Sequence, residues 1–376
     1  MVLCSMRIAM IGQKRTGSRE GGVEVVVGEL ARRMAELGHQ VTCYDRMGEG
    51  APYEPYEKDG YRIVPVKALD IKGLSALTSS FAATRAAIKD GADVIHYHAE
   101  GPCVPLRFAR SAGIRTVATI HGLDWQRAKW GGLASKYIKF GEATAAKCAD
   151  ALIVLSRGNQ EYFEKAYGRE ATLIPNGIAP EADLPAKEIT ERWGLTQGSY
   201  VLYLGRIVPE KRPELLVEAF KQVKTDKRLV IAGDSSDTED YAVALKEAAK
   251  NDPRVLFIGH VEGDLLSELY SNAYCYVLPS DVEGLPMSLL EAMSHGAACV
   301  TSDIPECADV LQGCGLTFPH GDAEALRDVL DGLLANSAQA EKLGAMARDR
   351  AINGYDWNSV VQRTLGLYEN NKEKYA

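Results

Sequence analysis

The chain has 376 residues, of which 46% are hydrophobic and 25% charged, a composition that predicts a soluble protein with two hydrophobic cores. Its net charge of −8 argues against a nucleic-acid-binding protein, and no apolar stretch approaches about 20 residues, which argues against a membrane-spanning helix. The charge is +5 over residues 1–180 and −13 over the remainder. Different partners for the two halves and chance variation between two domains both explain this asymmetry.

The first half alternates short apolar runs with amphipathic segments of helical length. Strands are predicted at 7–11, 40–45, 61–66, 93–98, 115–120, 151–155 and 172–175, and helices chiefly at 23–37, 75–89, 134–148 and 157–167. Strands that alternate with helices indicate a parallel sheet covered on both faces.

The pattern restarts after a segment, 180–199, that has the prolines and charges of a linker. Strands are then predicted at 200–205, 228–232, 254–259, 274–279 and 297–301, and helices at 212–224, 240–250, 263–272, 286–295, 322–335 and 338–352. We therefore expect two doubly wound α/β domains, 1–182 and 183–354, with a binding cleft between their sheets. A last helix, 355–376, is expected to pack back on the first domain.

Two features indicate a cytoplasmic protein. None of the eight cysteines forms a C-x-x-C pair, so buried free thiols in a reducing compartment are expected rather than a zinc or redox site. Residues 1–6, before the first strand, have no apolar core of a signal peptide.

A polar loop after the first strand is the first candidate anion site. Gly21 and Gly22 precede the helix from Val23, and glycines there let backbone N–H groups approach an anion. The spacing is not G-x-G-x-x-G, which argues against a nicotinamide or flavin site. A plain tight turn explains the same glycines.

The second half offers two cations beside a predicted strand end. Arg206 follows the strand 200–205, and Lys211 precedes Pro213 in the first turn of the next helix. A guanidinium and an ammonium at this place suit the oxygens of a diphosphate. The alternative is that both are solvated surface cations.

Two glutamates follow the predicted strand 274–279. Glu283 lies in the loop with Gly284, and Glu291 lies on the helix that Pro286 begins. A loop carboxylate can accept bonds from sugar hydroxyls, and a helix carboxylate can hold ribose hydroxyls. One such spacing also occurs by chance, and the flanking strand, glycine and proline are what favour a site.

The stretch EGLPMSLLEAMSHG, with GRIVPEKRPELLVEAF and IPNGI before it, resembles the retaining GT-B glycosyltransferases of family four over nearly the whole chain. The resemblance implies that Arg206 and Lys211 contact the donor diphosphate, and that Glu283 and Glu291 contact donor sugar and ribose. Further donor contacts are implied for the glycine loop, the base-binding turn and the loop after Glu283: Gly21, Gly22, His260, Val261, Gly284 and Leu285.

A second stretch, TIHGLDWQRAKWGG, with MIGQKRTGSREGGVEVVV and HYHAEGPC, resembles bacterial capsule and exopolysaccharide transferases, several of them rhamnosyltransferases. The resemblance implies that His121 contacts the donor sugar near the reacting centre. A satisfied structural histidine is the alternative. The acceptor-side loop would then contain Asp124, Trp125, Arg127 and Lys129.

The stretch 127–147 combines basic and aromatic residues. Such a helix can lie on an anionic membrane surface, or it can bury its apolar face in the core. The location is therefore expected to be cytoplasmic, with contact to the inner face of the plasma membrane as an open interpretation.

We expect transfer of a hexose or deoxyhexose from a nucleotide diphosphate sugar to a glycan or lipid-linked acceptor, with retention, in cell-surface polysaccharide synthesis. No carboxylate pair suggests a double displacement, and no two aspartates are separated by a single residue, so front-face attack without metal or cofactor is expected. A nucleotide-sugar epimerase and a non-catalytic nucleotide-sugar sensor of the same fold are the alternatives.

Overall fold

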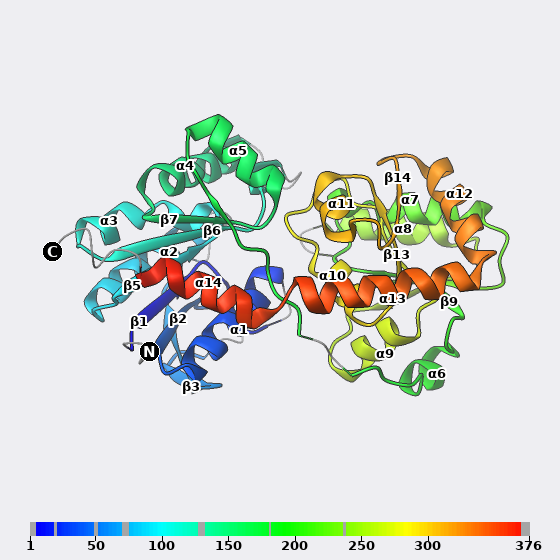
Figure 1. Ribbon diagram of the computed structural model, residues 1–376, viewed down its shortest axis with the longest axis horizontal. Coiled ribbons are helices and arrows are strands. Elements are labelled where there is room, and N and C mark those ends of the chain that lie inside the picture. Colours follow the sequence, from blue (N-terminus) through cyan, green and yellow to red (C-terminus); the bar gives the residue numbers. More distant parts are fainter. Residues whose placement is uncertain are drawn as a thin grey trace. The chain divides into compact units, whose positions relative to one another are not determined.

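The computed structural model of the chain describes residues 5–18, 21–48, 52–69, 75–126, 132–179, 182–235 and 238–369 (Figure 1). The chain divides into two compact units, Met1–Gly177 with Trp357–Ala376, and Ile178–Asp356. The first unit therefore includes the C-terminal helix α14 (Trp357–Glu369). None of the helices in the described ranges is long and apolar enough to cross a membrane.

The first unit is built on an eight-stranded sheet in the order β3-β4-β2-β1-β5-β6-β7-β8. Its strands are β1 (Arg7–Ile11), β2 (Gln40–Arg46), β3 (Tyr56–Lys58), β4 (Tyr61–Val66), β5 (Val94–His98), β6 (Arg115–Ile120), β7 (Ala151–Val154) and β8 (Thr172–Leu173). Its other helices are α1 (Gly22–Glu36), α2 (Ser75–Lys89), α3 (Leu106–Ser111), α4 (Gly132–Cys148) and α5 (Arg157–Tyr167). The strand pairs are parallel, except that the edge strand β3 pairs antiparallel with β4.

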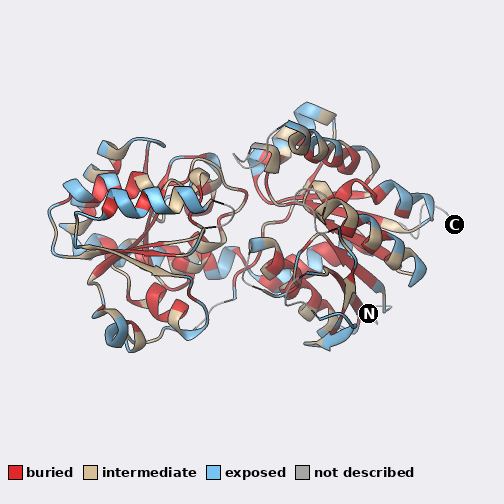
Figure 2. Ribbon diagram, turned by 180° about the vertical axis from the view of Figure 1, so that it is seen from behind, coloured by how far each residue is buried: buried red, intermediate tan, exposed pale blue. Residues whose placement is uncertain are grey.

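Each face of this sheet has its own core, because successive side chains of a strand point to opposite faces. Ile8 and Met10 of β1 pack in one core with residues of α1 and α14, which lie side by side in Figure 1. Ala9 and Ile11 pack in the other core, with residues of α2, α3, α4 and α5. Figure 2 shows the buried strands and the buried inner faces of these helices.

The second unit has a six-stranded parallel sheet in the order β11-β10-β9-β12-β13-β14. Its strands are β9 (Tyr200–Leu204), β10 (Arg228–Ala232), β11 (Val255–Gly259), β12 (Cys275–Leu278), β13 (Ala298–Ser302) and β14 (Leu316–Phe318). Its helices are α6 (Glu188–Trp193), α7 (Pro213–Gln222), α8 (Glu239–Ala249), α9 (Asp264–Asn272), α10 (Met287–Ser294), α11 (Pro305–Leu311), α12 (Ala323–Leu334) and α13 (Ser337–Gly354). Again one core covers each face, with Tyr200 and Leu202 on one side and Val201 and Tyr203 on the other.

The prediction of two doubly wound α/β domains is confirmed, with local corrections. The segment 180–199, interpreted as a linker, contains helix α6, because Ile189 and Leu195 are fully buried in the core of the second unit. Four short elements, β3, α3, α11 and β14, were not predicted. Each has seven residues or fewer, too few to show a clear period of hydrophobic residues.

Candidate functional site

The candidate donor residues of the second unit lie where the strand order reverses. From β9 the chain continues to β10 on one side, and after β11 it returns to β12 on the other side of β9. The loops after β9 and β12 therefore diverge above the sheet, and such a crevice is where doubly wound sheets bind ligands. Arg206 lies two residues after β9, and Glu283 lies in the loop after β12.

Two glycines allow the loops after β9 and β10 to touch beside Arg206. Gly233 has φ +129°, and a Cβ built on it would lie 1.9 Å from the carbonyl oxygen of Gly205. A side chain at position 233 is therefore excluded twice, by the backbone conformation and by the contact. The backbone N–H of Gly205 donates to the carbonyl of Ala232, 3.0 Å away.

Arg206 is half-buried, and its backbone carbonyl accepts a bond of 2.9 Å from the Tyr203 hydroxyl. Within the described part of the chain, its guanidinium makes no hydrogen bond or ion pair. The five N–H groups of a guanidinium suit the oxygens of an anion. Arg206 is therefore a cation at the crevice that can accept an anionic ligand without first breaking an ion pair of the described residues.

Lys211 and Glu283 form an ion pair across the same crevice. The Lys211 Nζ lies 2.7 Å from Glu283 Oε1, and the two side chains are 13% and 10% exposed. The hydroxyl of Ser280 donates to the same oxygen at 2.7 Å. The structure thus brings together two residues for which the sequence predicted separate contacts, so an anionic group beside Lys211 also lies beside the Glu283 carboxylate.

Arg212, which the sequence interpretation left without a role, fastens these two loops to each other. Its Nη1 donates to Asp281 Oδ2 at 2.9 Å, and its Nε donates to Glu214 Oε1 at 2.6 Å. The backbone N–H of Asp281 donates to the carbonyl of Glu210 at 2.9 Å. These contacts fix the loop that contains Glu283 relative to the turn that contains Lys211.

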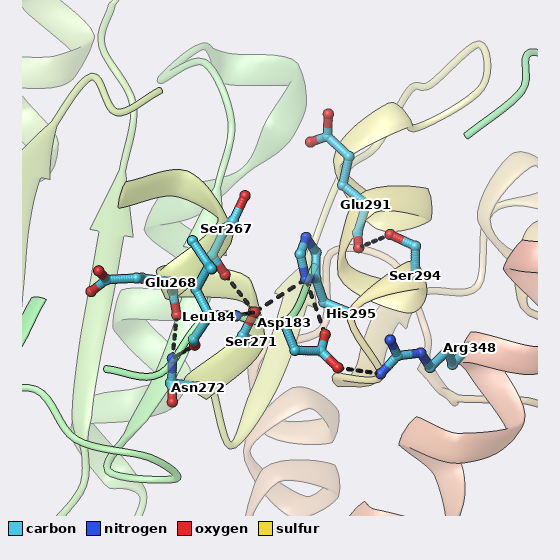
Figure 3. Close-up of polar contacts among 10 residues, drawn as sticks. All are labelled: Asp183, Leu184, Ser267, Glu268, Ser271, Asn272, Glu291, Ser294, His295 and Arg348. Carbon is cyan, nitrogen blue, oxygen red and sulfur yellow. Dashed lines mark hydrogen bonds and ion pairs between the residues drawn. The ribbon is translucent and has the colours of Figure 1, made fainter. Parts of the chain in front are cut away.

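Glu291 lies in the middle of helix α10 and is half-buried. Its Oε2 accepts a bond of 3.0 Å from the Tyr270 hydroxyl of α9. Its backbone carbonyl accepts bonds from the Ser294 hydroxyl and from the N–H of His295. Figure 3 shows the carboxylate of Glu291 pointing away from His295, which contacts Asp183.

The remaining candidate donor residues differ in exposure. His260 follows β11 and is exposed, with its Nε2 3.9 Å from Glu262 Oε2. Val261 is buried in the core of the second unit, so only its backbone faces the turn. Gly284 is buried, and Leu285 packs against the same core.

In the first unit, the strand order reverses between β1 and β5, and the glycine loop begins there. Gly12 has φ +132°, and a Cβ built on it would lie 2.1 Å from the carbonyl oxygen of His98. Gly21 caps helix α1 and Gly22 begins it, one residue before the predicted start at Val23. The carboxylate of Glu24 lies beside Gly21 and accepts the N–H of Lys14 at 3.1 Å. A carboxylate of the chain itself therefore lies at this helix N-terminus, which disfavours an anion there.

Three histidines lie in a row, His96 in the middle of β5, His98 at its end and His121 directly after β6. The rings of His96 and His98 are 4.1 Å apart, and His98 Nδ1 lies 3.1 Å from His121 Nε2. His96 also contacts the hydroxyls of Tyr368 (2.6 Å) and Thr119 (2.7 Å). Burial lowers the pKa of His96 to about 3 and places the pKa of His98 well below its usual value. The half-buried His121 therefore contacts the uncharged ring of His98, which in turn packs against the uncharged ring of His96.

The predicted acceptor-side residues rest on two buried glutamates. The N–H of Asp124 donates to Glu100 Oε1 at 2.8 Å, and the indole N–H of Trp125 donates to Glu142 Oε2 at 2.8 Å. Glu142 Oε1 also accepts bonds from two tyrosine hydroxyls, and Lys139 Nζ lies 3.9 Å from the centre of the Trp125 ring. Burial raises the pKa of Glu100 well above its usual value. Arg127 and Lys129 lie outside the described residues.

Sequence reasoning missed Glu100, Glu142, His98 and Tyr270. The signal for Glu100 and His98 was present, because HYHAEG places His98 at the end of a central strand of the sheet and Glu100 two residues after it. Glu142 and Tyr270 lie inside helices and have no local signal. Across the described residues, no three His, Cys, Asp or Glu side chains are gathered as metal ligands.

Comparisons with known proteins identify the family and the fold of the chain. Residues 20–182 match the family model described as Glycosyltransferase Family 4, and residues 186–350 match the model described as Glycosyl transferases group 1. The chain is 30% identical over 343 residues to the UDP-Gal:alpha-D-GlcNAc-diphosphoundecaprenol alpha-1,3-galactosyltransferase of Escherichia coli, covering 85% of this chain and 87% of that protein.

Two further matches extend over almost the whole chain. It is 28% identical over 392 residues to the alpha-maltose-1-phosphate synthase of Mycobacterium tuberculosis (strain CDC 1551 / Oshkosh), covering 96% of this chain and 99% of that protein. The solved structure of sucrose-phosphate synthase from Thermosynechococcus elongatus is similar in fold, with a TM-score of 0.84 and 23% identity over 96% of this chain and 98% of that chain. The chain belongs to the group 1 and family 4 glycosyltransferases, and it has their fold of two parallel-sheet domains.

Proposed function

We propose that the chain transfers a hexose or deoxyhexose, with retention, from a nucleotide diphosphate sugar to a glycan or lipid-linked acceptor. The observation that carries the proposal is the crevice after β9 and β12, where Arg206, Lys211 and Glu283 converge. Two cations and one carboxylate suit a ligand with an anionic diphosphate and a neutral, hydroxyl-rich sugar.

In this proposal the leaving diphosphate takes the proton of the acceptor hydroxyl as the new glycosidic bond forms on the same face. Arg206 and Lys211 stabilise the charge that grows on the diphosphate, because fixed cations in a half-buried site cost no reorganisation during the reaction. Glu283 orients the sugar and does not attack it. His121, held by His98, contacts the sugar near the reacting carbon.

The name of the Escherichia coli relative contains both a UDP-sugar and a diphosphoundecaprenol-linked sugar. We propose the same two chemical classes for this chain, a nucleotide diphosphate sugar and a lipid-linked or free glycan, with a role in cell-surface polysaccharide synthesis. Rhamnose remains one of the deoxyhexoses proposed, on the resemblance of TIHGLDWQRAKWGG alone.

A two-stage experiment tests the proposal. Thermal-shift measurements across nucleotide diphosphate sugars identify the donor, since a ligand that binds the folded state raises its melting temperature. Proton NMR of the transfer product then gives the anomeric configuration. Conversion of the donor without an acceptor would instead indicate an epimerase. Binding without transfer or hydrolysis, for every acceptor tried, would indicate a sensor.

We further propose that helices α2, α3 and α4 contact an anionic membrane surface. Phe81, Phe108 and Phe140, one from each helix, are 38%, 48% and 49% exposed. The rings of Phe81 and Phe108 are 5.9 Å apart, and the Arg107 guanidinium lies 5.4 Å from Phe108 and 6.0 Å from Phe140.

The charges of these three helices support the same partner. Their exposed charged side chains are all basic, namely Arg85, Lys89, Arg107, Arg110, Lys136, Lys139 and Lys147. Their single acidic residue, Glu142, is buried. Basic side chains around exposed aromatic rings are typical of surfaces that bind anionic lipid headgroups.

Sedimentation with liposomes that contain phosphatidylglycerol tests the membrane contact. We expect the protein to sediment at low salt, to be released by salt, and to lose most binding in the Phe108→Ser/Phe140→Ser variant. Val243→Ser is the matched control, because Val243 is an apolar side chain of the second unit that is 67% exposed. Absence of sedimentation at low salt would leave a soluble acceptor or a protein partner.

A further inference from the structure

Tyr270 connects the core of the second unit to the carboxylate of Glu291. The tyrosine is 1% exposed, and its hydroxyl donates to Glu291 Oε2 at 3.0 Å. The two residues belong to different helices, α9 and α10, and are 21 positions apart. A carboxylate on a flexible three-carbon side chain is therefore held by a group that itself cannot move freely.

The Tyr270 ring is fixed between two other rings. The His295 ring stacks on it, with centroids 5.6 Å apart and planes 12° apart, and the Tyr276 ring packs at 6.0 Å. Aromatic contacts of this kind add to the stabilisation that burial gives. The hydroxyl of Tyr270 is thus presented to Glu291 from a clamped position.

His295 is in turn held by polar contacts, which Figure 3 shows. Its Nδ1 lies 3.5 Å from Asp183 Oδ1 and 3.2 Å from the Ser271 hydroxyl. Arg348 of α13 holds the other oxygen of Asp183 at 2.6 Å. The His295 side chain is 3% exposed, so the ring that supports Tyr270 is itself immobilised by three elements.

We propose that Tyr270, clamped by His295, is a positioning residue that orients the Glu291 carboxylate toward the ribose hydroxyls of the donor nucleotide. The inference rests on the proposed function, because it takes the nucleotide diphosphate donor from there, and it takes the ribose contact of Glu291 from the family resemblance. A hydroxyl that donates to Oε2 fixes the rotation of the carboxylate and leaves it the acceptor capacity that vicinal hydroxyls require. Ribose binding then depends on a residue that does not touch the nucleotide.

Calorimetry with two ligands tests this role. The ligands are the nucleoside diphosphate that stabilises the wild-type protein most in a thermal-shift screen and its 2′,3′-dideoxy analogue. We expect Tyr270→Phe to weaken binding of the hydroxylated ligand about 5-fold, the scale of one ordinary hydrogen bond, and to change binding of the dideoxy ligand less than about 2-fold. Tyr200→Phe is the matched control, because the buried Tyr200 hydroxyl donates to the Leu269 carbonyl and not to Glu291.

Two substitutions of His295 give a second readout. His295→Phe keeps an aromatic ring on Tyr270 but loses the contact with Asp183, whereas His295→Ala removes the ring. We expect the preference for the hydroxylated ligand to survive in His295→Phe and to fall in His295→Ala. Equal loss in both variants would show that the polar contacts, and not the clamp, are what matter.

Glu291→Gln separates failure of the inference from failure of the proposed function. If Glu291→Gln loses the preference for the hydroxylated ligand and Tyr270→Phe keeps it, the positioning role is wrong and the ribose contact stands. If Glu291→Gln keeps the preference, the ribose contact is wrong and the inference falls with it. If Tyr270→Phe weakened the binding of both ligands equally, Tyr270 would have a purely structural role.

Discussion

The two units place functional side chains at the same point of the same topology but surround them with opposite electrostatics. At the strand-order reversal of the second unit, charges are paired with charges, as in Lys211–Glu283 and Arg212–Asp281. At the reversal of the first unit, buried groups are driven toward their neutral forms, since the pKa of His98 is lowered and that of Glu100 is raised. The paired charges of the second unit suit a charged ligand, and the neutral groups of the first unit suit the hydroxyl groups of a sugar.

This contrast indicates how one architecture, present twice, can serve two halves of one reaction. A diphosphate needs fixed cations, and the ion pair of Lys211 with Glu283 compensates one of these charges before the ligand binds. A sugar hydroxyl needs oriented donors and acceptors, and neutral imidazoles supply them without a charge that must be compensated. Substitutions in either unit test the two sides of this contrast separately.

The largest effect is expected at Arg206. We expect Arg206→Ala to lower kcat at least about 100-fold with the fold intact, because the variant loses a cation that stabilises the leaving diphosphate in the transition state. Steady-state kinetics with saturating donor measure it. The control is Arg192→Ala, which removes an exposed arginine of α6 in the same unit.

Lys211→Ala should lower kcat to a similar degree but also destabilise the second unit. Glu283 is only 10% exposed and would lose its cationic partner. If both Arg206→Ala and Lys211→Ala turned over donor at nearly the wild-type rate, the assignment of the diphosphate site would be wrong.

The second largest effect is expected on the stability of the first unit at low pH. The pKa of His96 is lowered from about 6.5 to about 3 by burial, so only the unfolded state binds its proton at pH 5. The stability that neutral His96 contributes is complete above pH 6.5 and is lost as pH falls from 6.5 toward 3. At pH 5, which is 1.5 pH units below the unfolded-state pKa of 6.5, the free energy of unfolding is lower by about 2 kcal/mol.

His96→Gln should remove this loss, since an amide keeps hydrogen-bonding capacity for Tyr368 and Thr119 but does not titrate. Native-state hydrogen exchange of β5 at pH 7.5 and pH 5 measures it in the first unit alone. Glu100, whose pKa is raised, acts in the opposite direction but is present in both proteins. Identical pH dependence in wild type and variant would mean that His96 titrates like an exposed histidine.

The third effect separates the two glutamates of the second unit. Glu291→Gln should weaken the binding of the complete donor and of the free nucleoside diphosphate alike, each by about 10-fold, because the proposed contact of Glu291 is to ribose. Glu283→Gln should weaken mainly the binding of the complete donor, because the proposed contact of Glu283 is to the sugar. Calorimetry with both ligands decides it, and equal losses for both variants with both ligands would refute the division of roles.

Local patterns were enough to predict most of the strands and longer helices and the positions of Arg206 and Glu283 after strands, but not the pairing of Lys211 with Glu283. Helices α2 and α5 have the predicted bounds, and Arg206 and Glu283 lie after the predicted strands. The Lys211–Glu283 pair joins residues 72 positions apart. Its formation depends on the neighbouring positions of β9 and β12, which no local pattern gives.

Helix α6 was missed for a related reason. Its buried residue Ile189 and the nearby Leu195 contribute to a core whose other members are distant in sequence, so only the tertiary structure shows why this short helix forms. Glu142 illustrates the same limit, because its three donors come from two segments distant from it in sequence, Trp125 from the loop after β6, and Tyr162 and Tyr167 from α5.

The smallest effect is expected on removal of divalent metal. We propose that Arg206 and Lys211 supply the charge compensation that a metal ion gives the leaving diphosphate in other transferases. Both cations lie at the crevice, and the sequence has no two aspartates separated by a single residue, a pattern that would offer carboxylates to magnesium beside phosphates. The transfer rate after exhaustive EDTA treatment should therefore change less than about 2-fold.

Added magnesium or manganese distinguishes a catalytic metal from a metal that acts on the product. A modest stimulation agrees with the proposal, because magnesium binds free nucleoside diphosphates and can speed their release. Complete loss of transfer in EDTA, restored by one metal, would contradict it. The contrast between the units would then change as well, because Glu283 would have to be reconsidered as a metal ligand rather than a sugar contact, and its ion pair with Lys211 as the form the site takes before the metal binds.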